Sequence, residues 1–492
     1  MTQLQSPGVE QSAKRKLSGS LGAIAIVFMV VAAASPLTVI GGAAPLGILL
    51  GNGVGFPALY AVSAVILLLF AVGLAAMSRH IPRPGAFFTY VGYGLGRSTG
   101  LAAAWIAMLT YTTIQVSVYG YIGYILSYTL QAYTGVALPW WLFSLLVIGL
   151  VGTLGYRHID LSSRVLGVLL IAEVGIVAVL VAVVVFTGGG PEGLSLATFE
   201  PANVVSGSPG VGLMFAIAAF IGFEATAIFR DEARDPDKTI PRATYLAVIG
   251  IGVFYTVAAW GLVMAWGPSD VVAEAAADPG SLILRTMATY LGSAGEIVTN
   301  VLLITSMFAC VLSFHNVVTR YQHSMASAGV LPERLGAVHH RHLSPHASSI
   351  VQTITAAVLI AVFALFQLDP VLAVFTWFAG VATLAIAILM ALTSVAVIVY
   401  FARHRKDTRI WNTIIAPGLG FVGLILSAVL IVAYFPIMVG DADAEGNPVF
   451  GGLSWFLLAL VVVFPLLGYL QAAWIRSRHP AAYAKLTDAI AG

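Results

Sequence analysis

Apolar runs of about 20 residues recur along the whole of this 492-residue chain, and they limit its fold more than any other feature. An α-helix of that length crosses a hydrocarbon layer of about 30 Å. Only 9% of the residues are charged, whereas a soluble domain carries about 25%. We therefore predict an all-α, multi-pass membrane protein. Its twelve predicted transmembrane helices lie at about 20–50, 53–78, 100–130, 138–156, 162–187, 210–229, 243–267, 294–322, 347–366, 371–400, 411–439 and 452–475.

The basic residues lie on one side of the predicted spans. Of the 23 Lys and Arg residues, 22 fall in tails and alternate loops that would share one face, and only Arg285 falls outside. Cytoplasmic loops carry an excess of Lys and Arg, so we expect both tails, 1–19 and 476–492, to be cytoplasmic in a protein of the cell membrane (plasma or inner). We expect no cleavable signal peptide, because a full-length span follows the basic N-terminal segment.

Two predicted spans are interrupted by helix-breaking residues. The first contains "AAASPLTVIGGAAPLG" (32–47), and the sixth contains "FIGFE" (220–224). These spans head two halves of the chain, 20–187 and 210–400, and two additional helices follow in 411–475. Irregular backbone at membrane depth must line a cavity or be buried in protein, and paired breaks indicate a transporter binding site; simple helix kinks are the alternative. The candidate substrate-binding residues at the breaks are Ser35, Pro36, Leu37, Thr38, Ile40, Gly41, Gly42, Phe220, Ile221, Gly222 and Phe223.

The breaks also indicate what charge the substrate carries. Free N–H groups at a half-helix N-terminus attract a carboxylate, and free carbonyls at a half-helix C-terminus attract an ammonium group. No Lys or Arg lies in the core of any predicted span. A neutral zwitterion or a cation therefore fits better than a dianion.

Two carboxylates fall at membrane depth. Glu224 lies in the sixth-span break, and Glu173 lies in the apolar run "SSRVLGVLLIAEVGIVAVL" (162–180). A charge at the bilayer centre costs about 3 kcal/mol or more, so such residues are usually functional and face the bundle interior. We predict both as proton-coupling residues; a structural hydrogen bond to a neighbouring helix is the alternative for each.

A polar stripe in the third span supplies further candidates. Tyr111, Gln115 and Tyr119 recur at four-residue spacing and share one helix face. A polar stripe in hydrocarbon should face the interior, so Tyr111 and Gln115 are candidate substrate-binding residues. Hydrogen bonds between helices, without contact to a substrate, are the alternative.

Several other functions lack support in the sequence. The single cysteine, Cys310, allows no internal disulfide and no cysteine-based metal site. The histidines of "HHRH" (339–342) are expected to lie in a solvated basic loop rather than to bind a metal. "GNGVG" (51–55) lacks the Lys-Ser/Thr of a phosphate loop. We find no paired catalytic groups and no basic groove for nucleic acid, so we expect neither an enzyme nor a cofactor.

Three loop stretches resemble the amino acid–polyamine–organocation permeases. They are "MSRHIPRPGAFFTYVGYGLGRSTGLAAAW" (77–105), "FIGFEATAIFRDEARDPDKTIPRA" (220–243) and "RYQHSMASAGVLPERLGAVHHRHLSPHAS" (320–348). The resemblance covers about 20–400. It implies a five-plus-five inverted repeat of the leucine-transporter type, with broken helices 1 and 6, alternating access, and a site between spans 1, 3, 6, 8 and 10.

The resemblance also assigns roles to individual residues. Phe314 stands roughly where the arginine–agmatine member stacks a Trp on its substrate, so it is a candidate substrate-binding residue. Glu173 stands where proton-coupled relatives have a Lys. Ser-Pro-Leu-Thr-Val-Ile-Gly-Gly (35–42) replaces the Gly-Ser-Gly of many members and looks more like the putrescine-importer branch.

We therefore predict a secondary active amino-acid transporter that imports neutral or cationic amino acids, coupled to protons. The alternatives are a polyamine or organocation importer, and an amino-acid exchanger without proton coupling. Sodium is less favoured, because the eighth-span stretch offers Cys310 and Ser313, although Thr305 and Ser306 lie one turn earlier. The expected partners are the substrate, protons and the lipid bilayer, and the expected assembly is a monomer or a homodimer.

Overall fold

The computed structural model describes residues 22–81, 87–157, 163–224, 226, 233–339, 344–404, 406–445 and 447–490. In these ranges the regular elements are all helical, which confirms the predicted class. Nine helical segments there are long and apolar enough to cross a membrane, and two shorter apolar helices, α7 and α10, accompany them. The twelve spans and the inverted repeat stay predictions.

The principal helices are α1 (Ala23–Ala34), α4 (Phe56–Ser78), α5 (Phe87–Leu95), α6 (Arg97–Thr134), α7 (Trp140–Tyr156), α8 (Ser163–Phe186), α10 (Pro209–Ala218), α11 (Pro236–Trp266), α13 (Leu282–Ser327), α14 (His346–Leu365), α15 (Thr376–His404), α16 (Ala416–Ala433) and α18 (Gly452–Arg478). Shorter elements are α2 (Pro36–Thr38), α3 (Ala44–Leu46), α9 (Pro201–Val204), α12 (Val271–Ala277), α17 (Phe435–Val439) and α19 (Pro480–Ile490).

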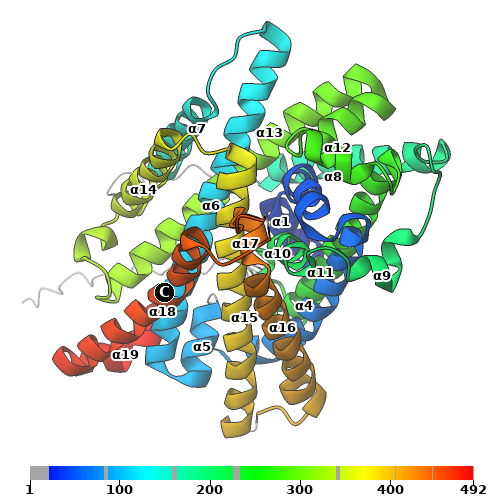
Figure 1. Cartoon of the computed structure of the whole chain (residues 1–492). Helices are drawn as coiled ribbons and strands as arrows, with labels where there is room; N and C mark the ends of the chain where they lie inside the picture. The colour runs from blue at the N-terminus through cyan, green and yellow to red at the C-terminus, as the bar shows by residue number, and fades with distance from the viewer. Residues whose placement is uncertain are drawn as a thin grey trace, which may run out of the picture.

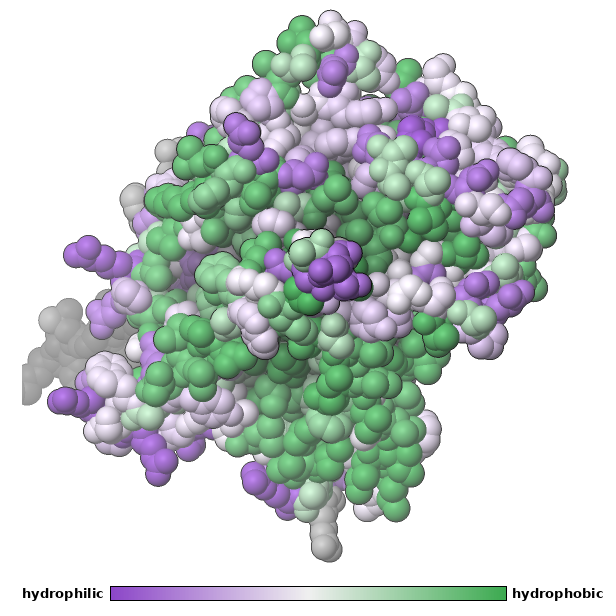
Figure 2. Space-filling view, viewed as in Figure 1, coloured by the Kyte–Doolittle hydropathy of each residue, from purple (hydrophilic) through white to green (hydrophobic). Residues whose placement is uncertain are grey.

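The helices form one bundle around α6 and α15 (Figure 1). The α7 and α14 helices pack side by side against α6, while α4 and α11 pair on another side of the bundle. Apolar side chains cover much of the face in Figure 2. Large apolar side chains such as Leu419, Val422 and Leu426 of α16 are exposed. A helix surface of this kind is suited to lipid rather than to water.

The first predicted break divides a helical stretch into two. The α1 helix ends at Ala34, and Ser35 adopts a left-handed conformation (φ 56°, ψ 69°). Pro36 then begins α2, which continues through the π-helical segment η1 (Val39–Ala43), α3 and the π-helical segment η2 (Gly47–Asn52). Proline lacks an N–H donor and is tolerated at a first helical position. It therefore favours a new helix start at this point.

The second predicted break ends α10 earlier than the sequence suggests. A helix is predicted over 210–229, but α10 stops at Ala218 and the chain turns through residues 219–222. Gly222 has φ 109°, a backbone conformation that favours glycine. Residues 225 and 227–232 lie outside the described residues. The helix therefore ends at the break rather than merely bending, and Gly222 lies in the non-helical segment that follows.

The α13 helix begins before the predicted span. It starts at Leu282 rather than near 294, and Gly292 interrupts it with φ 68°. The predicted span therefore corresponds to the part of α13 after this kink. Residues from both breaks and from α13 meet in one region of the bundle interior.

Candidate functional site

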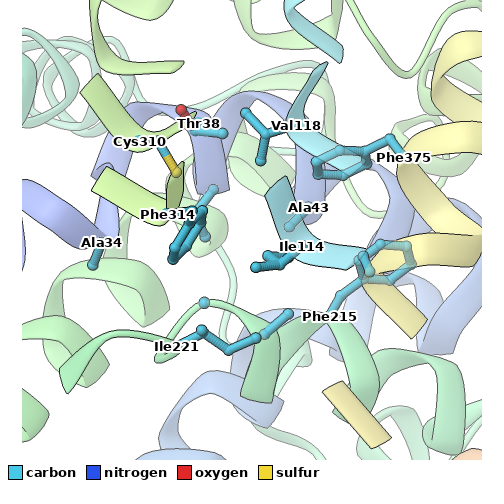
Figure 3. A pocket seen from close by; sticks show the side chains of 14 residues that line it. Ala34, Thr38, Ala43, Ile114, Val118, Phe215, Ile221, Cys310, Phe314 and Phe375 are labelled. Atoms are coloured by element: carbon cyan, nitrogen blue, oxygen red, sulfur yellow. The ribbon is translucent and has the colours of Figure 1, made fainter. Parts of the chain in front are cut away.

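A small cavity lies between the two broken helices (Figure 3). Its volume is about 40 Å³, which has room for a water molecule but not for an amino acid. Its lining residues come from both sides of the first break, α6, α10 and the turn after it, α13, the π-helical segment η7 (Pro370–Phe375) and α15. They are Ala34, Thr38, Val39, Ala43, Ile114, Val118, Phe215, Ala218, Ala219, Ile221, Cys310, Phe314, Phe375 and Ala379.

The cavity has an apolar wall. Phe314, Ile114 and Phe375 contribute large side chains to it, whereas Thr38 and Cys310 are its polar or polarisable members (Figure 3). No carboxylate or basic side chain is among the lining residues that the structure describes. The geometry suits an apolar side chain better than a charged one.

A cluster of hydrogen bonds connects the first break to α13. The Ser35 hydroxyl lies 2.6 Å from the Ser306 hydroxyl and 2.8 Å from the Thr38 hydroxyl, and it donates to the Ser306 carbonyl at 2.8 Å. One hydroxyl donates a single hydrogen, so it accepts in at least one of these contacts. These bonds tie the left-handed residue of the break to α13.

Glu173 joins the same cluster from α8. Its Oε2 accepts a hydrogen bond from the Ser306 hydroxyl at 2.7 Å and from the Leu37 backbone N–H at 3.3 Å. The side chain is buried, and no ion pair to it appears among the described residues. A carboxylate at the N-terminal end of α2 is favourably placed, because the first amides of a helix lack helical partners. Glu173 therefore connects the break in span 1 to α8 and α13.

Glu224 lies in the second break. Its Oε2 accepts a hydrogen bond from the Gly222 backbone N–H at 2.9 Å, whereas its buried Oε1 has no hydrogen-bond partner among the described residues. Ile221, which lines the central cavity, lies with Glu224 around a second, much smaller void. Glu224 is therefore adjacent to the cavity but is not part of its wall.

Six of the predicted substrate-binding residues lie on the cavity or support the breaks beside it. Thr38, Ile221 and Phe314 lie on the cavity. Ser35, Leu37 and Gly222 support the breaks through hydrogen bonds or backbone conformation. The roles of all of them in binding stay predictions.

The other predicted residues of the first break face neighbouring helices. Ile40 is buried but is not among the lining residues of the cavity. Gly41 and Gly42 lie against the Tyr121 ring of α6, where an added Cβ would approach within 2.9 Å of the ring or its hydroxyl. Pro36 lies on a different cavity, between α1, α8 and α11. At Gly41 and Gly42 the break is thus tightly packed against α6.

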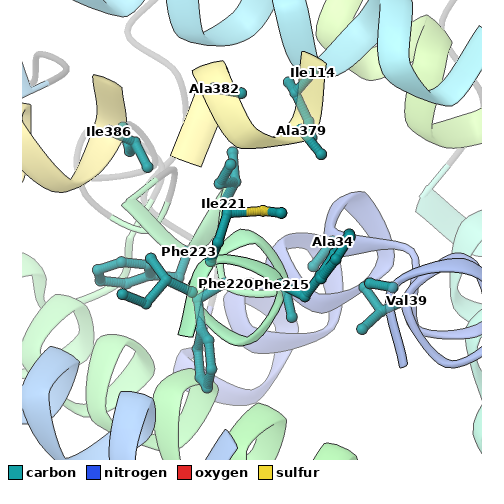
Figure 4. Packing of buried hydrophobic residues seen from close by; sticks show 14 of the residues in the cluster. Ala34, Val39, Ile114, Phe215, Phe220, Ile221, Phe223, Ala379, Ala382 and Ile386 are labelled. Carbon is teal, nitrogen blue, oxygen red and sulfur yellow. The ribbon is translucent and has the colours of Figure 1, made fainter. Parts of the chain in front are cut away.

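Two predicted phenylalanines of the second break contact neighbouring aromatic rings. The Phe220 ring lies 6.4 Å from the Tyr255 ring. The Phe223 ring lies 6.1 Å from Phe70 and 6.3 Å from Phe87, centroid to centroid. In Figure 4 their side chains lead away from Ile221. They pack the second break against the bundle.

The predicted polar stripe of α6 makes contacts between helices. Gln115 donates to the Val311 carbonyl at 3.1 Å and accepts from the Gln352 side-chain amide at 2.7 Å. The Tyr111 ring lies 6.0 Å from Phe314 and 5.6 Å from Tyr321, between ring centroids. The cavity is instead lined by Ile114 and Val118, one residue before Gln115 and three after it.

Sequence reasoning missed Phe375 and gave too little weight to Ser306. Phe375 ends η7, whose first amides are capped by Asp369: its Oδ1 accepts from Val371 N at 2.8 Å and from Leu372 N at 2.6 Å. The Asp369-Pro370 pair is a helix-start signal that could have placed this aromatic residue near a helix N-terminus. Ser306 carries no such local signal, because its partners Ser35 and Glu173 are distant in sequence.

Within the described part of the chain, no group of three or more His, Cys, Asp or Glu side chains could hold a metal ion. His339 and His346 pack instead as aromatic rings against Tyr156, at centroid distances of 5.3 and 5.9 Å. His340 and His342 lie outside the described residues.

Comparison with known proteins gives a match over nearly the whole chain. Residues 15–465 match the family model described as "Amino acid permease". The low-affinity putrescine importer PlaP of Escherichia coli (strain K12) is 22% identical over 338 residues, 67% of this chain and 72% of that protein. The branched-chain amino acid permease BcaP of Lactococcus lactis subsp. cremoris (strain MG1363) is 26% identical over 447 residues, 84% of this chain and 87% of that protein. The L-asparagine permease of Escherichia coli (strain K12) is 25% identical over 339 residues, 65% of each chain.

Proposed function

Because this chain belongs to the amino acid permease family, we propose that it imports neutral, apolar amino acids by proton-coupled alternating access. The relatives are amino acid and putrescine transporters, so the chain is a transporter rather than an enzyme. The coupling ion, the alternation and the choice of substrate are the proposed part.

The apolar wall of the central cavity supports the choice of substrate. Both breaks face this cavity, so unpaired backbone groups of the half-helices can meet the carboxylate and the ammonium of an amino acid. Phe314, Phe375 and Ile114 would then surround its side chain. The cavity of about 40 Å³ is too small for such a ligand, so this closed conformation must widen to bind one.

The observation that carries the proposed coupling is the position of Glu173. It is a buried carboxyl that bonds at once to the Leu37 amide of α2 and to the Ser306 hydroxyl of α13. An ionised carboxylate only accepts hydrogen bonds, whereas a protonated carboxyl also donates one. Gain or loss of a proton would therefore change the contacts that join α8 to the broken helix. Glu224, beside the second break, is the second proposed proton-coupling residue.

The topology follows from the same proposal. The two breaks around one cavity support a five-plus-five inverted repeat in 20–187 and 210–400, followed by two helices in 411–475. The distribution of basic residues supports cytoplasmic termini. The only cysteine, Cys310, is buried. Single cysteines introduced into loops of a Cys310→Ala protein, labelled from outside the cell, would test which loops are external.

Import of putrescine is the second candidate, and the similarity to PlaP favours it. A diamine carries two positive charges and needs anionic partners when it is desolvated. The cavity lining that the structure describes contains no carboxylate, and Glu224 lies behind Ile221. Apolar amino acids are therefore preferred.

The test is uptake into proteoliposomes that contain the purified protein. Labelled leucine, valine, asparagine, lysine and putrescine are compared under an inward proton gradient without sodium. The Glu173→Gln variant is measured beside Glu296→Gln, a matched change at a partly exposed carboxylate of α13. We expect accumulation of leucine or valine in the wild type and in Glu296→Gln, and its loss in Glu173→Gln.

The outcomes separate the parts of the proposal. Wild-type uptake that appears only as exchange and ignores the gradient would refute proton coupling while leaving amino-acid transport intact. Accumulation of putrescine alone would replace the proposed substrate with the second candidate. Full gradient-driven uptake by Glu173→Gln would leave Glu173 with a structural role only.

A further inference from the structure

A second cavity is about ten times larger than the central one and opens on the outer surface of the bundle. It has a volume of about 450 Å³ and lies between α1, α8 and α11. Small-ligand sites typically enclose about 300–1,000 Å³. Ile171 of α8 and Leu246 of α11 border it and are 62% and 50% exposed. We call it the α1–α8–α11 fissure.

The lining of the fissure excludes water as its natural occupant. Its side chains are apolar, as illustrated by Val31, Val174 and Phe254, apart from the buried Tyr255 hydroxyl, which has no hydrogen-bond partner among the described residues. A buried water needs two to four polar partners. An apolar volume open toward a bilayer is instead filled by hydrocarbon, because an empty space forfeits dispersion contacts along its whole wall.

The inner wall of the fissure includes a residue of the first break. Pro36, the first residue of α2, lines it. Val174 lines it as well and directly follows Glu173, whose carboxylate points to the Leu37 amide. A molecule in the fissure would therefore rest on α2 and α8, two of the three elements that the Glu173 cluster joins.

A positive charge lies in line with the fissure on α11. Arg242 is exposed and precedes Leu246 and Gly250 by four and eight residues. Residues four apart share a helix face, and eight residues of α-helix rise by about 12 Å. Leu246 and Gly250 line the fissure, so Arg242 stands beyond one end of it, near the start of α11. An apolar slot with a cation at one end matches a lipid with an anionic headgroup.

We propose that an anionic diacyl phospholipid occupies the α1–α8–α11 fissure. One acyl chain lies between the three helices against Pro36 and Val174, and the phosphate lies at Arg242. The bound lipid stabilises the closed form of the first break, because it fills a space that exists in this conformation. Transport is then sensitive to lipid composition, a consequence that rests on the proposed function, whereas the lipid site itself does not.

The test measures bound lipid and does not depend on transport. The full chain is purified in detergent, stripped of lipid and titrated with phosphatidylglycerol or phosphatidylcholine, with native mass spectrometry as the readout. Gly250→Leu and Gly175→Leu fill the fissure from two different helices, since an added Cβ at either glycine has no neighbour within 4 Å. Gly418→Leu on α16 is the control, because its Cβ is equally unobstructed and it does not line the fissure.

We expect wild type and Gly418→Leu to bind phosphatidylglycerol about fivefold more tightly than phosphatidylcholine, a preference that one surface arginine can supply. Arg242→Gln should bind both lipids with equal affinity. Both fissure-filling variants should lose at least one bound phospholipid. Unchanged lipid binding by two folded fissure-filling variants would overturn the site, and equal binding of both lipids by the wild type would overturn the role of Arg242.

Discussion

Ser35 gives the sharpest test of how the first break is held. It is fully buried and has a left-handed backbone, which among the described non-glycine residues it shares only with Gln367. Glycine would adopt this conformation without strain, but it could not make the hydrogen bonds of the Ser35 hydroxyl to Thr38 and Ser306. We infer that these bonds are the reason for a serine at this position. Comparing the glycine and alanine variants should therefore separate the energy of backbone strain at position 35 from the energy of the hydroxyl hydrogen bonds.

Both variants lose the same hydroxyl contacts. Side-chain hydrogen bonds between membrane helices contribute about 0.6 kcal/mol on average and at most about 1.7 kcal/mol. Loss of the bonds to Thr38 and Ser306 should therefore lower the free energy of unfolding by about 1–3 kcal/mol. Alanine keeps the left-handed strain of about 1–2 kcal/mol, while glycine removes it but costs about 0.5–1 kcal/mol in backbone entropy. Ser35→Gly should remain about 0.5–1 kcal/mol more stable than Ser35→Ala.

The assay is equilibrium unfolding in mixed micelles, with the double variant Ser35→Ala/Ser306→Ala completing a thermodynamic cycle. Residues in direct contact show coupling energies of about 0.5–3 kcal/mol. We expect a coupling near 1 kcal/mol between these two positions, in line with the membrane average. Equal stability of the glycine and alanine variants, together with zero coupling, would refute the reasoning.

Three further predictions follow from neighbouring contacts. Phe375→Ala enlarges the central cavity, so competition for uptake should shift toward larger apolar amino acids, and an unchanged preference would remove Phe375 from the pocket. Asp369→Ala should lower the free energy of unfolding by about 1 kcal/mol because it removes a helix cap, whereas Asp369→Asn should restore most of it in the same unfolding assay. Gly41→Ala places a Cβ 2.9 Å from the Tyr121 hydroxyl, so the Tyr121 ring must move; we expect transport to fall at least tenfold while Gly418→Ala, with no neighbour within 4 Å, transports normally.

The sequence predicts the breaks well because their causes are local. Ser35-Pro36 and Gly222 carry backbone restrictions that act wherever the chain is placed. The burial of Glu173 and Glu224 follows from the same logic, since each lies in an apolar run long enough to enter the membrane. These features could be predicted without knowing which helices are neighbours.

The partners of those residues could not be predicted in the same way. The sequence places Gln115 in the bundle interior and leaves open whether it meets a substrate or another helix; in the structure Gln352, which is 237 residues away, donates a hydrogen bond to it. Both arrangements obey the rule that a buried polar group needs a partner. Sequence alone does not fix the rotation of one helix against another, so it could not choose between them. For the same reason, the sequence could not show that Ser306 is the residue of α13 that donates a hydrogen bond to Glu173.

The contacts of Glu173 also suggest why an acid can stand at a position where the family resemblance implies a lysine. A lysine would bring a positive charge to the free carbonyls at the end of α1. Glu173 instead engages the opposite side of the break, the Leu37 amide at the start of α2, and reaches α13 through Ser306. An ionised carboxylate is the better acceptor for both donors, so loss of the proton should tighten the joint between α2, α8 and α13. On the proposed mechanism, proton binding then loosens the first break, and the proton that enters with the substrate releases the helix that must move.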